Sequence, residues 1–505
     1  MRPSFHNVCA DVHLRSRRGN IRVMPLAAKY NQNSEPAHLP AHLFACLNCC
    51  GSLVAGETVL RCLSCASEFA IRLGVPLLVK GCEIVENTEK ISDQTLVAIS
   101  KAYGLTGDDA SRTFFEGVLA HRYHFADSAL DSENNLLLQR LGLDNPPNRC
   151  ATTTPKSVGQ PHWNLVRHYF PAKLQAKLKI SFNVRIRNTS DFSLVSNWTK
   201  GEGYQLVPRW LESAKEEECA PLPVSLPPGE DVTVPVYVET PSKRGKHMLQ
   251  LSLRSPFFKN SCVDPVEVPI NIVRPTSWLA SYFKRMPVSD SWFRPVYGPT
   301  IEGYDADHHV AIRIVHEEAV RRKSRIGLEI GGCSTPMTTN LPCQIVSTDI
   351  DVQTLQVGRF VFARRAHTNV TFVCCDGHDL PFQPASFDFV AIFSALHHFS
   401  DPGAVLRRAA KLMRNGAFMA VMCEPVGHYR GKPDDECLEQ MTLGVNEQRF
   451  SLAEYEHMFR DAGFEASSTQ IDHDSLKCIL QLRKKVNGLR RNLARKASEL
   501  CGLIR

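Results

Sequence analysis

The pattern of apolar and polar positions changes character three times along the chain of 505 residues. Between residues 90 and 143, apolar positions such as Leu96 and Ile99 recur at helical spacing, which predicts a helical segment. Between residues 170 and 275, short alternating runs are separated by turn signals, which is typical of a β-sandwich. From Ile326 onward, continuous apolar runs alternate with helical segments, as in βαβ units around a parallel sheet. We therefore predict a multidomain chain with a doubly wound, Rossmann-like α/β domain near its C-terminus.

These changes divide the chain into seven predicted segments. The β-sandwich segment is similar in pattern to the Ig-like accessory domains of multidomain enzymes. The last segment combines basic residues with leucines, which favours a helix with a solvated basic face; contact with a membrane surface is the alternative. The boundaries are 1–42 for a disordered N-terminus, 43–80 for a compact cysteine-bearing unit, 81–145 for the helical segment, 146–169 for a linker, 170–275 for the β-sandwich, 296–482 for the α/β domain and 483–505 for the C-terminal helix.

Composition and charge exclude several classes of protein. Hydrophobic residues make up 43% of the chain and charged residues 22%, so each domain can bury a core. The net charge of +7 is too small by itself to indicate a nucleic-acid-binding protein. No apolar run approaches the roughly 20 residues that cross a bilayer, and the first 24 residues lack the apolar segment of a secretory signal. The 18 cysteines are too dilute for a disulfide scaffold, so we expect a reducing, cytoplasmic location.

Four cysteines have the spacing of a zinc site. Cys46 and Cys49 form one Cys-x2-Cys pair, Cys62 and Cys65 form a second, and twelve residues separate the pairs. Two such pairs can place four thiolates tetrahedrally around one ion. Because no histidine or carboxylate is in register with them, we predict a closed, structural Zn²⁺ site. Cys50 adjoins Cys49 and could replace it as a ligand.

The unit around these cysteines resembles a known family. The pairs are followed by the run Glu68-Phe-Ala-Ile-Arg-Leu-Gly-Val-Pro76. The short zinc-ribbon proteins that activate RNA and protein methyltransferases combine cysteine pairs with a similar strand. The resemblance implies a role in scaffolding or in presenting a substrate.

Small and acidic residues follow the first four apolar runs of the α/β domain. Glycine lets the backbone approach a ligand closely, and we expect a helix to begin near Pro336, directly after the glycines. An acid at the tip of the second strand can accept both hydroxyls of a ribose. The first run leads into Gly331-Gly332-Cys333-Ser334, the second and third end at Asp349 and Asp376, and the fourth leads into Ser394-Ala-Leu-His-His-Phe399.

Taken in order, these residues resemble the class I S-adenosylmethionine-dependent methyltransferases over about residues 300–470. Family members place acids and glycines after the first three strands, Phe-Asp before the fourth, Leu-His-His-Phe after it and a glycine turn before the fifth. Two features depart from the family: Cys333 stands at its second glycine, and residues 335–341 leave room for only a short helix. The matching motifs are Glu329-Ile-Gly331, Asp349, Asp376 with Leu380-Pro-Phe382, Phe387-Asp388, Leu396-His-His-Phe399 and Met413-Arg-Asn-Gly416.

The resemblance implies S-adenosylmethionine as the cofactor and a role for each site residue. The methyl group is already activated on the sulfonium, so the protein mainly positions the reactants. A base is needed only for a poor nucleophile such as a sugar hydroxyl, and His397 and His398 are the candidates. Glu329, Gly331 and Gly332 would line the methionine end, Asp349 would hold the ribose, Ile350 would pack on the adenine, Asp376 and Gly377 would contact the adenine edge, and Ser394 and His397 would lie beside the methyl group.

Simpler interpretations stay open for several of these residues. Asp351 competes with Asp349 for the ribose, and Asp379 competes with Asp376 for the adenine. The two histidines are at least as consistent with hydrogen-bonded side chains that take no part in catalysis. Asp388 is expected to be structural.

We predict a methyltransferase that acts on an unidentified acceptor. The accompanying β-sandwich favours, by analogy, a glycan or glycolipid precursor or a small metabolite. RNA methylation is a second hypothesis, because zinc ribbons often accompany RNA-modifying domains, although no aromatic and basic platform for stacking bases is evident. A non-enzymatic scaffold or binding protein with a degenerate cofactor pocket is the third, motivated by Cys333. The oligomeric state is not predicted by the sequence.

Overall fold

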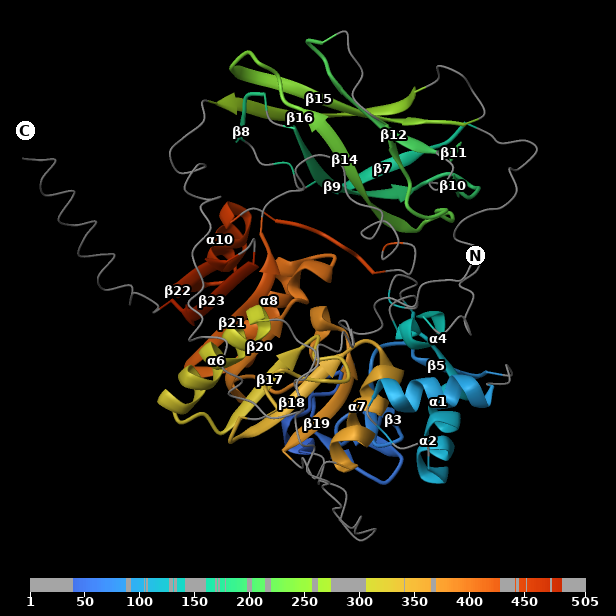
Figure 1. Ribbon diagram of the computed structural model, residues 1–505, viewed down its shortest axis with the longest axis vertical. Helices are drawn as coiled ribbons and strands as arrows, with labels where there is room; N and C mark the ends of the chain where they lie inside the picture. The colour runs from blue at the N-terminus through green and yellow to red at the C-terminus, as the bar shows by residue number, and fades with distance from the viewer. Residues whose placement is uncertain are drawn as a thin grey trace, which may run out of the picture.

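The computed structural model describes residues 40–87, 92–126, 130–140, 160–273, 306–426 and 441–483, with gaps of at most five residues inside these ranges. The predicted N-terminal segment up to residue 39, most of the predicted linker and the predicted C-terminal helix from residue 484 onward lie outside the described residues. Figure 1 shows the α/β part in yellow to red, the all-β part in green and the N-terminal part in blue. Among the described helices, none is long and apolar enough to cross a membrane.

One sheet of eleven strands runs through the described α/β and N-terminal parts, in the order β1-β2-β3-β4-β19-β18-β17-β20-β21-β23-β22. From β17 the chain moves outward to β19, then returns to the other side of β17 as β20, and these neighbours are parallel. The sheet is therefore doubly wound, which confirms this part of the predicted fold, and its order reverses between β17 and β20. The strands are β17 (Ile326–Ile330), β18 (Gln344–Asp349), β19 (Val370–Cys375), β20 (Phe387–Phe393), β21 (Met413–Pro425), β22 (Phe464–Asp472) and β23 (Ser475–Leu482).

Helices cover both faces of this sheet. α8 and α10 contribute Val405 and Tyr455 to one hydrophobic cluster, whereas α6 and α7 contribute Val315 and Leu355 to a second. The parallel strands read as continuous apolar runs because their side chains are buried on both faces. The helices are α6 (Ala306–Arg321), α7 (Val352–Arg364), α8 (Pro402–Leu412) and α10 (Leu452–Asp461), with short 3₁₀ turns η5 (Gly377–Asp379) and η6 (Leu396–His398).

The connection from β17 to β18 differs from the prediction. Its described residues form turns, where a helix was expected to begin near Pro336. The carboxylate of Glu329 accepts hydrogen bonds from the backbone amides of Met337 at 2.8 Å and Thr338 at 2.9 Å. A buried side chain thus holds this loop, and no helix N-terminus is described at this edge of the sheet among residues 331–339.

The cysteine-bearing segment adds its strands to the edge of the same sheet. Its strand β4 pairs in parallel with β19, with Leu77 opposite Cys374. Leu43 and Phe44 belong to the hydrophobic cluster that also contains α8, and the backbone amide of Gln383 donates to Leu43 O at 2.8 Å. A segment this short buries few apolar residues, and sharing the larger core supplies the rest. Its elements are η1 (Ala41–Leu43), β1 (Leu53–Ala55), β2 (Val59–Cys62), β3 (Glu68–Arg72) and β4 (Val75–Leu78).

The predicted helical segment packs on α7. Phe114 stacks on Phe360 of α7 with ring centroids 3.9 Å apart, and Gln353 of α7 donates to the carbonyl of His121 at 3.0 Å. The segment also contains two antiparallel strands, which were not predicted because four residues each are too few to show a period. Its elements are β5 (Glu83–Glu86), α1 (Asp93–Ala102), α2 (Asp109–Leu119), β6 (His121–His124) and α4 (Leu136–Arg140).

Two further sheets enclose a third hydrophobic cluster. Phe182 and Val184 come from the sheet β14-β9-β7, and Leu249 and Leu251 come from the sheet β13-β12-β15-β16-β8. β7 lies inside the predicted linker, which forms a strand there because Trp163 is buried in this cluster. The strands are β7 (Trp163–His168), β8 (Lys173–Gln175), β9 (Lys179–Asn188), β12 (Gln205–Trp210), β13 (Ala220–Pro221), β14 (Asp231–Glu239), β15 (Gly245–Arg254) and β16 (Cys262–Val273), with β10 (Ser196–Asn197) and β11 (Glu202–Gly203) as a separate pair.

The sheet β14-β9-β7 lies against the carboxyl ends of the central strands (Figure 1). Each of its strands contributes one polar contact to this interface. That the all-β part acts as an accessory domain stays a prediction. The sheet β14-β9-β7 lies beside the edge where strands β17 to β20 end, so it can border a site at this edge. The contacts join Thr233 to Asn446 at 2.7 Å, Asn183 to the carbonyl of Glu447 at 3.3 Å, and Arg167 to Asp401 at 3.3 Å.

Candidate active site

The carboxyl ends of β17 and β20 meet where the strand order reverses, which is where ligands of doubly wound sheets bind. Gly331 follows β17 with φ of +76°, and a Cβ at this position would lie 2.5 Å from the Cβ of Ala395, which follows β20. Only glycine allows the two chain segments to approach this closely. The structure thus brings the predicted residues Gly331 and Ser394 to the same point of the sheet.

Backbone hydrogen bonds tie the glycine turn to the end of β18. The amides of Gly331 and Gly332 both donate to Thr348 O, at 2.8 and 3.0 Å. Cys333 has φ of +50°, a left-handed conformation that costs a non-glycine residue about 1–3 kcal/mol. The cysteine therefore keeps the backbone path that a glycine would follow, with a half-buried side chain.

Asp349, at the tip of β18, faces this turn. Its Oδ2 accepts from the amide of Cys333 at 3.0 Å, and its Oδ1 accepts from the amides of Ile350 and Asp351 at 2.7 and 3.0 Å. Burial raises the pKa of Asp349, against the effect of these three amides and the charge of His398. An ionised carboxylate offers about four acceptor positions, so about one remains for a ribose hydroxyl. Binding of both hydroxyls, as predicted, would displace a backbone donor.

The Glu329 carboxylate holds the loop that follows β17 through hydrogen bonds. It is 1% exposed, and its Oε2 accepts from the amide of Thr338 at 2.9 Å and from the Thr338 hydroxyl at 2.5 Å. Burial raises the pKa of Glu329 to about 7, although these donors and the Met337 amide oppose the shift. Its carboxylate is thus directed into the loop after β17. Gly332 packs closely against β18, because a Cβ at this glycine would lie 2.2 Å from Ser347 Oγ.

Asp376 and Gly377 lie at the end of β19. Asp376 Oδ1 accepts from the backbone amide of His378 at 2.9 Å and from its Nδ1 at 2.8 Å. Burial would raise the pKa of Asp376, but the hydrogen bonds and charge of His378 outweigh it and lower that pKa. A Cβ at Gly377 would lie 2.5 Å from the ring of Phe399, so this segment packs tightly against the residues that follow β20.

The acids that competed with these residues have structural roles. Asp351 caps α7, accepting from the amide of Thr354 at 3.3 Å. Asp379 forms an exposed ion pair with Lys80. Asp388 accepts from the amide of Ile326 at 3.1 Å, at the amino end of β17 and far from the carboxyl edge.

Ser394 holds a strained position directly after β20. Its φ is +47°, and its hydroxyl donates to Cys423 O at 3.1 Å while lying 3.1 Å from Nε2 of His308. His308 belongs to α6, and sequence reasoning did not identify it. Because the Ser394 hydroxyl proton is directed to Cys423, its oxygen can accept a hydrogen bond from His308 Nε2.

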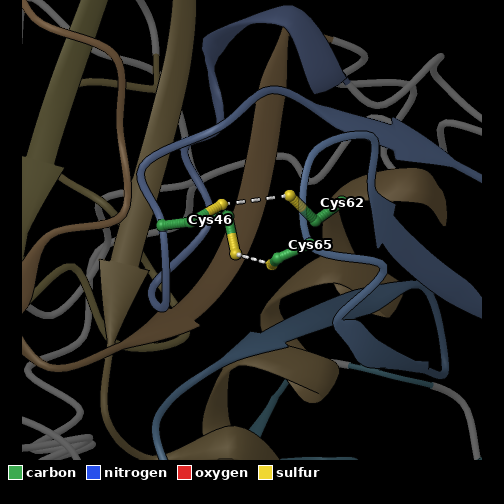
Figure 2. A group of neighbouring side chains, drawn as sticks. Cys46, Cys62 and Cys65 are labelled. Atoms are coloured by element: carbon green, nitrogen blue, oxygen red, sulfur yellow. Dashed lines mark hydrogen bonds between the residues drawn. The ribbon is translucent and has the colours of Figure 1, made fainter.

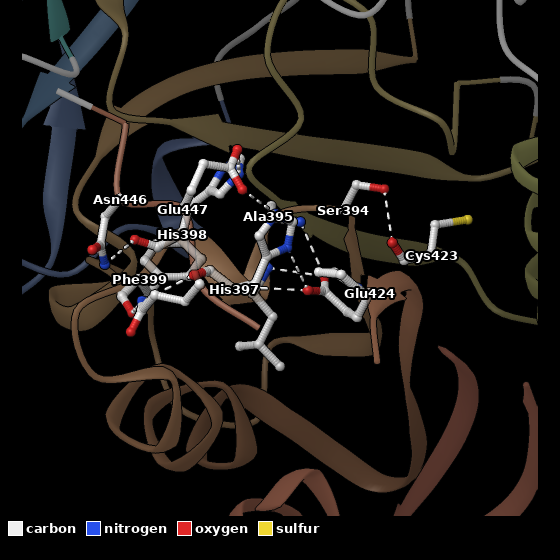
Figure 3. Close-up of polar contacts among 12 residues, drawn as sticks. Ser394, Ala395, His397, His398, Phe399, Cys423, Glu424, Asn446 and Glu447 are labelled. Carbon is white, nitrogen blue, oxygen red and sulfur yellow. Dashed lines mark hydrogen bonds and ion pairs between the residues drawn. The ribbon is translucent and has the colours of Figure 1, made fainter. Parts of the chain in front are cut away.

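His397 is oriented by a buried acid, Glu424, at the end of β21 (Figure 3). Glu424 is fully buried and accepts from the amides of Ala395, Leu396 and His397 at 2.9 to 3.0 Å, and from His397 Nδ1 at 2.8 Å. A carboxylate can only accept, so Nδ1 carries the proton and Nε2 presents a lone pair. The sequence held one signal for Glu424: it ends the fifth apolar run as Asp349 ends the second.

His398 and His397 both face Glu447 (Figure 3). Glu447 Oε1 lies 3.2 Å from His398 Nε2, and Glu447 Oε2 lies 3.7 Å from His397 Nε2. Burial would raise the pKa of Glu447, but the charge and hydrogen bond of His398 lower it to about 2. Sequence reasoning missed Glu447, which lies 49 residues after His398. The predicted catalytic histidines are therefore part of a three-residue cluster.

The four predicted zinc ligands converge in the N-terminal part. Figure 2 shows three of them, Cys46, Cys62 and Cys65, with their sulfur atoms directed toward one another. Cys46 Sγ lies 3.6 Å from Cys65 Sγ, and Cys49 Sγ lies 3.5 Å from Cys62 Sγ. A disulfide would need about 2.05 Å, whereas Zn–S bonds of about 2.3 Å in a tetrahedron place sulfurs about 3.8 Å apart. Their sulfur atoms all lie within 4.8 Å of one another, and Cys50 is exposed outside this group. The donor set thus fits one zinc ion.

A doubly wound sheet with a glycine turn and an acid at the tips of neighbouring strands is an architecture of proteins that bind nucleotide-like cofactors. Residues 328–421 match a protein family described as a methyltransferase domain. This region of the chain is therefore similar to a methyltransferase domain. It contains all ten of the predicted cofactor and catalytic positions, from Glu329 to His398, but ends before Glu424 and Glu447.

Several known proteins are similar to part of the chain. The 27-O-demethylrifamycin SV methyltransferase of Amycolatopsis mediterranei is 31% identical over 134 residues, which are 25% of this chain and 48% of that protein. The demethylmenaquinone methyltransferase of Corynebacterium kroppenstedtii is 33% identical over 93 residues, 18% of this chain and 37% of that protein. The chain thus spans half or less of these relatives. The solved YcgJ protein of Bacillus subtilis is 16% identical, with a TM-score of 0.28, over 34% of this chain and 97% of that one.

Proposed function

We propose that this chain is an S-adenosylmethionine-dependent methyltransferase whose cofactor lies at the carboxyl edge of the sheet. The observation that carries the proposal is the placement of Asp349 opposite the glycine turn at the reversal point, inside the methyltransferase match. The turn supplies a close backbone approach, and the half-buried Asp349 retains acceptor capacity for a ribose hydroxyl. S-adenosylmethionine, when bound, supplies a methyl group already activated on a sulfonium sulfur.

The remaining residues of this edge have roles consistent with that placement. Gly331 and Gly332 would face the methionine end, while Glu329 supports them through the loop that it holds. Ile350 is half-buried beside Asp349 and would pack on the adenine. Asp376 and Gly377 would meet the adenine edge, and Ser394 would lie beside the methyl group. These assignments keep the predicted positions and change one mode of action, that of Glu329.

We propose a small molecule or a glycan as the acceptor. Both curated relatives are named for methylation of small molecules, and the sheet β14-β9-β7 stands beside the edge at which an acceptor would arrive. His397 is the group best placed to receive a proton from an acceptor hydroxyl, because Glu424 fixes its Nδ1 proton and leaves Nε2 as the basic atom.

The four cysteines would hold a structural Zn²⁺, which implies a reducing location such as the predicted cytoplasm.

Calorimetry with S-adenosylhomocysteine tests this function on the full chain. We expect saturable binding by the wild type and by Asp379→Asn, whose exposed acid lies outside the proposed site. Asp349→Asn should bind at least about tenfold more weakly, because a hydrogen bond to a charged group contributes about 1.5–3 kcal/mol. Folding of each variant is checked by circular dichroism. A folded wild-type protein that releases no heat at millimolar ligand would favour the scaffold hypothesis and overturn the proposal.

A further inference from the structure

Three side chains at the carboxyl edge form a second candidate metal centre, separate from the cysteine cluster. His397, His398 and Glu447 each offer one ligand atom, and these three atoms lie within 4.8 Å of one another. We propose that this triad binds a divalent transition-metal ion of the kind that imidazole and carboxylate ligands prefer. The proposal rests on the geometry of the triad and on the residues that orient it.

The imidazole ring of His397 is already held in the orientation that a metal ligand needs. Its Nδ1 donates to Glu424, and its Nε2 faces Glu447 Oε2 at 3.7 Å. A neutral ring presents a lone pair there, which a bound cation would bridge to the carboxylate, whereas a proton on Nε2 would make the contact a plain ion pair. Glu424 is fully buried, and its four donors fill its acceptor positions, so its direction is fixed. A carboxylate that holds the second nitrogen of a histidine is the usual partner of a metal-bound imidazole.

The distances fit a bound ion. Bonds of about 2.0–2.2 Å from nitrogen or oxygen to a metal place ligand atoms about 3–4 Å apart. Each histidine Nε2 lies 3.2 or 3.7 Å from the nearer Glu447 oxygen, which is in this range. Two imidazoles and one carboxylate leave at least one position open, as catalytic sites do and the four-cysteine cluster does not.

Glu447 is held in place by its neighbours in sequence. The side-chain amide of Asn446 donates to His398 O at 2.9 Å, and that of Gln448 donates to the carbonyls of His397 and Phe399, both at 2.9 Å. The residue between these two anchors is thereby directed at the histidine pair. The side chains of His398 and Glu447 are 35% and 23% exposed, so an ion and an oxygen ligand can reach the cluster.

The cluster lies at the edge proposed for the cofactor, since His397 and His398 follow the carboxyl end of β20 and Asp349 ends the parallel strand β18. If the proposed function holds, the open position would take an oxygen of the acceptor, and the ion would lower the pKa of a hydroxyl bound there. The histidines then act as ligands, in place of the role of base. The acceptor class that this predicts is an alcohol, phenol or enol; an amine or a carbon acceptor has no need of such a site.

Cobalt(II) provides the probe, because its visible spectrum distinguishes nitrogen and oxygen ligands from thiolates. One equivalent of zinc per chain is first supplied to the full chain, which the four thiolates bind in preference to nitrogen and oxygen ligands, and Co²⁺ is then titrated. We expect one further ion per chain, with weak bands and without the intense charge-transfer absorption of a thiolate complex. Glu447→Gln and His398→Ala should each lower the Co²⁺ affinity by at least about a hundredfold, while Glu465→Gln and His457→Ala, which change exposed residues elsewhere, should retain it.

Binding of S-adenosylhomocysteine is measured on the same samples. Cobalt binding that survives in folded Glu447→Gln, or no uptake beyond the cysteine site, would show that the triad is only an ion pair of His398 with Glu447 and overturn this proposal. If the nucleoside binds but cobalt does not, the metal site fails and the proposed function stands. If cobalt binds and the nucleoside does not, the metal site stands and the proposed function fails.

Discussion

The cysteine cluster and the histidine–glutamate cluster differ in what surrounds them. Cys46 and Cys62 are buried in a hydrophobic cluster shared with the central sheet, and four sulfurs complete a closed donor set. The histidine–glutamate cluster has three donors, is partly exposed, and lies where the sheet β14-β9-β7 meets the carboxyl edge. The first arrangement favours stability, because its four donors leave no coordination position open and two of them, Cys46 and Cys62, belong to the core. The histidine–glutamate arrangement leaves a coordination position open and accessible to solvent, so that chemistry can take place there.

The same distinction separates the strand-tip acids. Glu329 is enclosed and directs its carboxylate to Met337 and Thr338, so it supports the fold. Asp349 is half-buried and retains acceptor capacity, so it can serve a ligand. Each acid accepts from three protein donors, so the difference between structure and binding lies in burial: Glu329 is enclosed, whereas Asp349 is accessible at the strand tip.

The largest effect is expected at the cysteine cluster. Cys62→Ser removes a ligand from a site whose metal-binding free energy in small zinc peptides is about 10–16 kcal/mol. We expect loss of one zinc per chain and a fall in apparent melting temperature of roughly 10 °C, since β2 and β4 help to extend the central sheet. Metal analysis and calorimetry measure both. Cys50→Ser should change neither, and an equal loss in that variant would mean that the ligand set is wrong.

The next effect concerns pH and Glu329. The folded-state pKa of about 7 exceeds the ordinary value of 4.5, so the folded protein binds this proton more tightly than the unfolded chain does. The resulting stability is fully present below about pH 4.5 and is lost as pH rises through 7. Comparing Glu329→Gln with the wild type by chemical denaturation, we expect the stability advantage of the wild type to shrink by about 2.5 kcal/mol from pH 5 to pH 8. A constant difference would show that Glu329 stays ionised throughout.

A smaller effect on stability is expected when the histidine–glutamate cluster is altered. Glu447→Gln removes one ionic partner from a partly exposed group, so the unfolding free energy should fall by about 1 kcal/mol or less. Methyl transfer should nevertheless fall steeply if the site binds an acceptor. A melting temperature that drops as far as that of Cys62→Ser would remove the distinction between the two clusters.

The smallest effect should come from the interface above this cluster. Thr233→Val keeps the side-chain shape but deletes the hydrogen bond to Asn446, worth about 1 kcal/mol. We expect a Co²⁺ affinity lowered about fivefold or less, through a less fixed Glu447. Ser252→Ala, on a strand of the other sheet, is the matched control. Equal cobalt affinity in Thr233→Val and the wild type would show that the all-β part does not position Glu447.

The features that were predictable are those encoded locally. Buried parallel strands appear as continuous apolar runs, and the residues that follow them must share one edge, so the doubly wound sheet and the positions of Asp349 and Asp376 could be derived. The convergence of the four cysteines followed from two short spacings. The hydrogen-bond partners of these side chains depend on the three-dimensional fold, which the spacing of residues along the sequence does not determine.

The features that were missed depend on contacts between distant segments. The pairing of β4 with β19 joins residues almost 300 positions apart, and four apolar residues in β4 fit a ribbon strand as well as a sheet edge. Glu447 lies in a polar stretch without periodicity, so nothing local links it to His398. The described residues 331–339 form turns in place of the helix expected near Pro336, and the contacts of the buried Glu329 with this loop are visible only in three dimensions.

A crystal structure of the full chain with S-adenosylhomocysteine tests the central claim most directly. We predict the nucleoside at the carboxyl ends of β17, β18 and β19, with a ribose hydroxyl at hydrogen-bond distance, about 2.5–3.0 Å, from the Asp349 carboxylate and the sulfur beside the Gly331 turn. A nucleoside bound elsewhere, or bound at this edge with its ribose away from Asp349, would contradict the account.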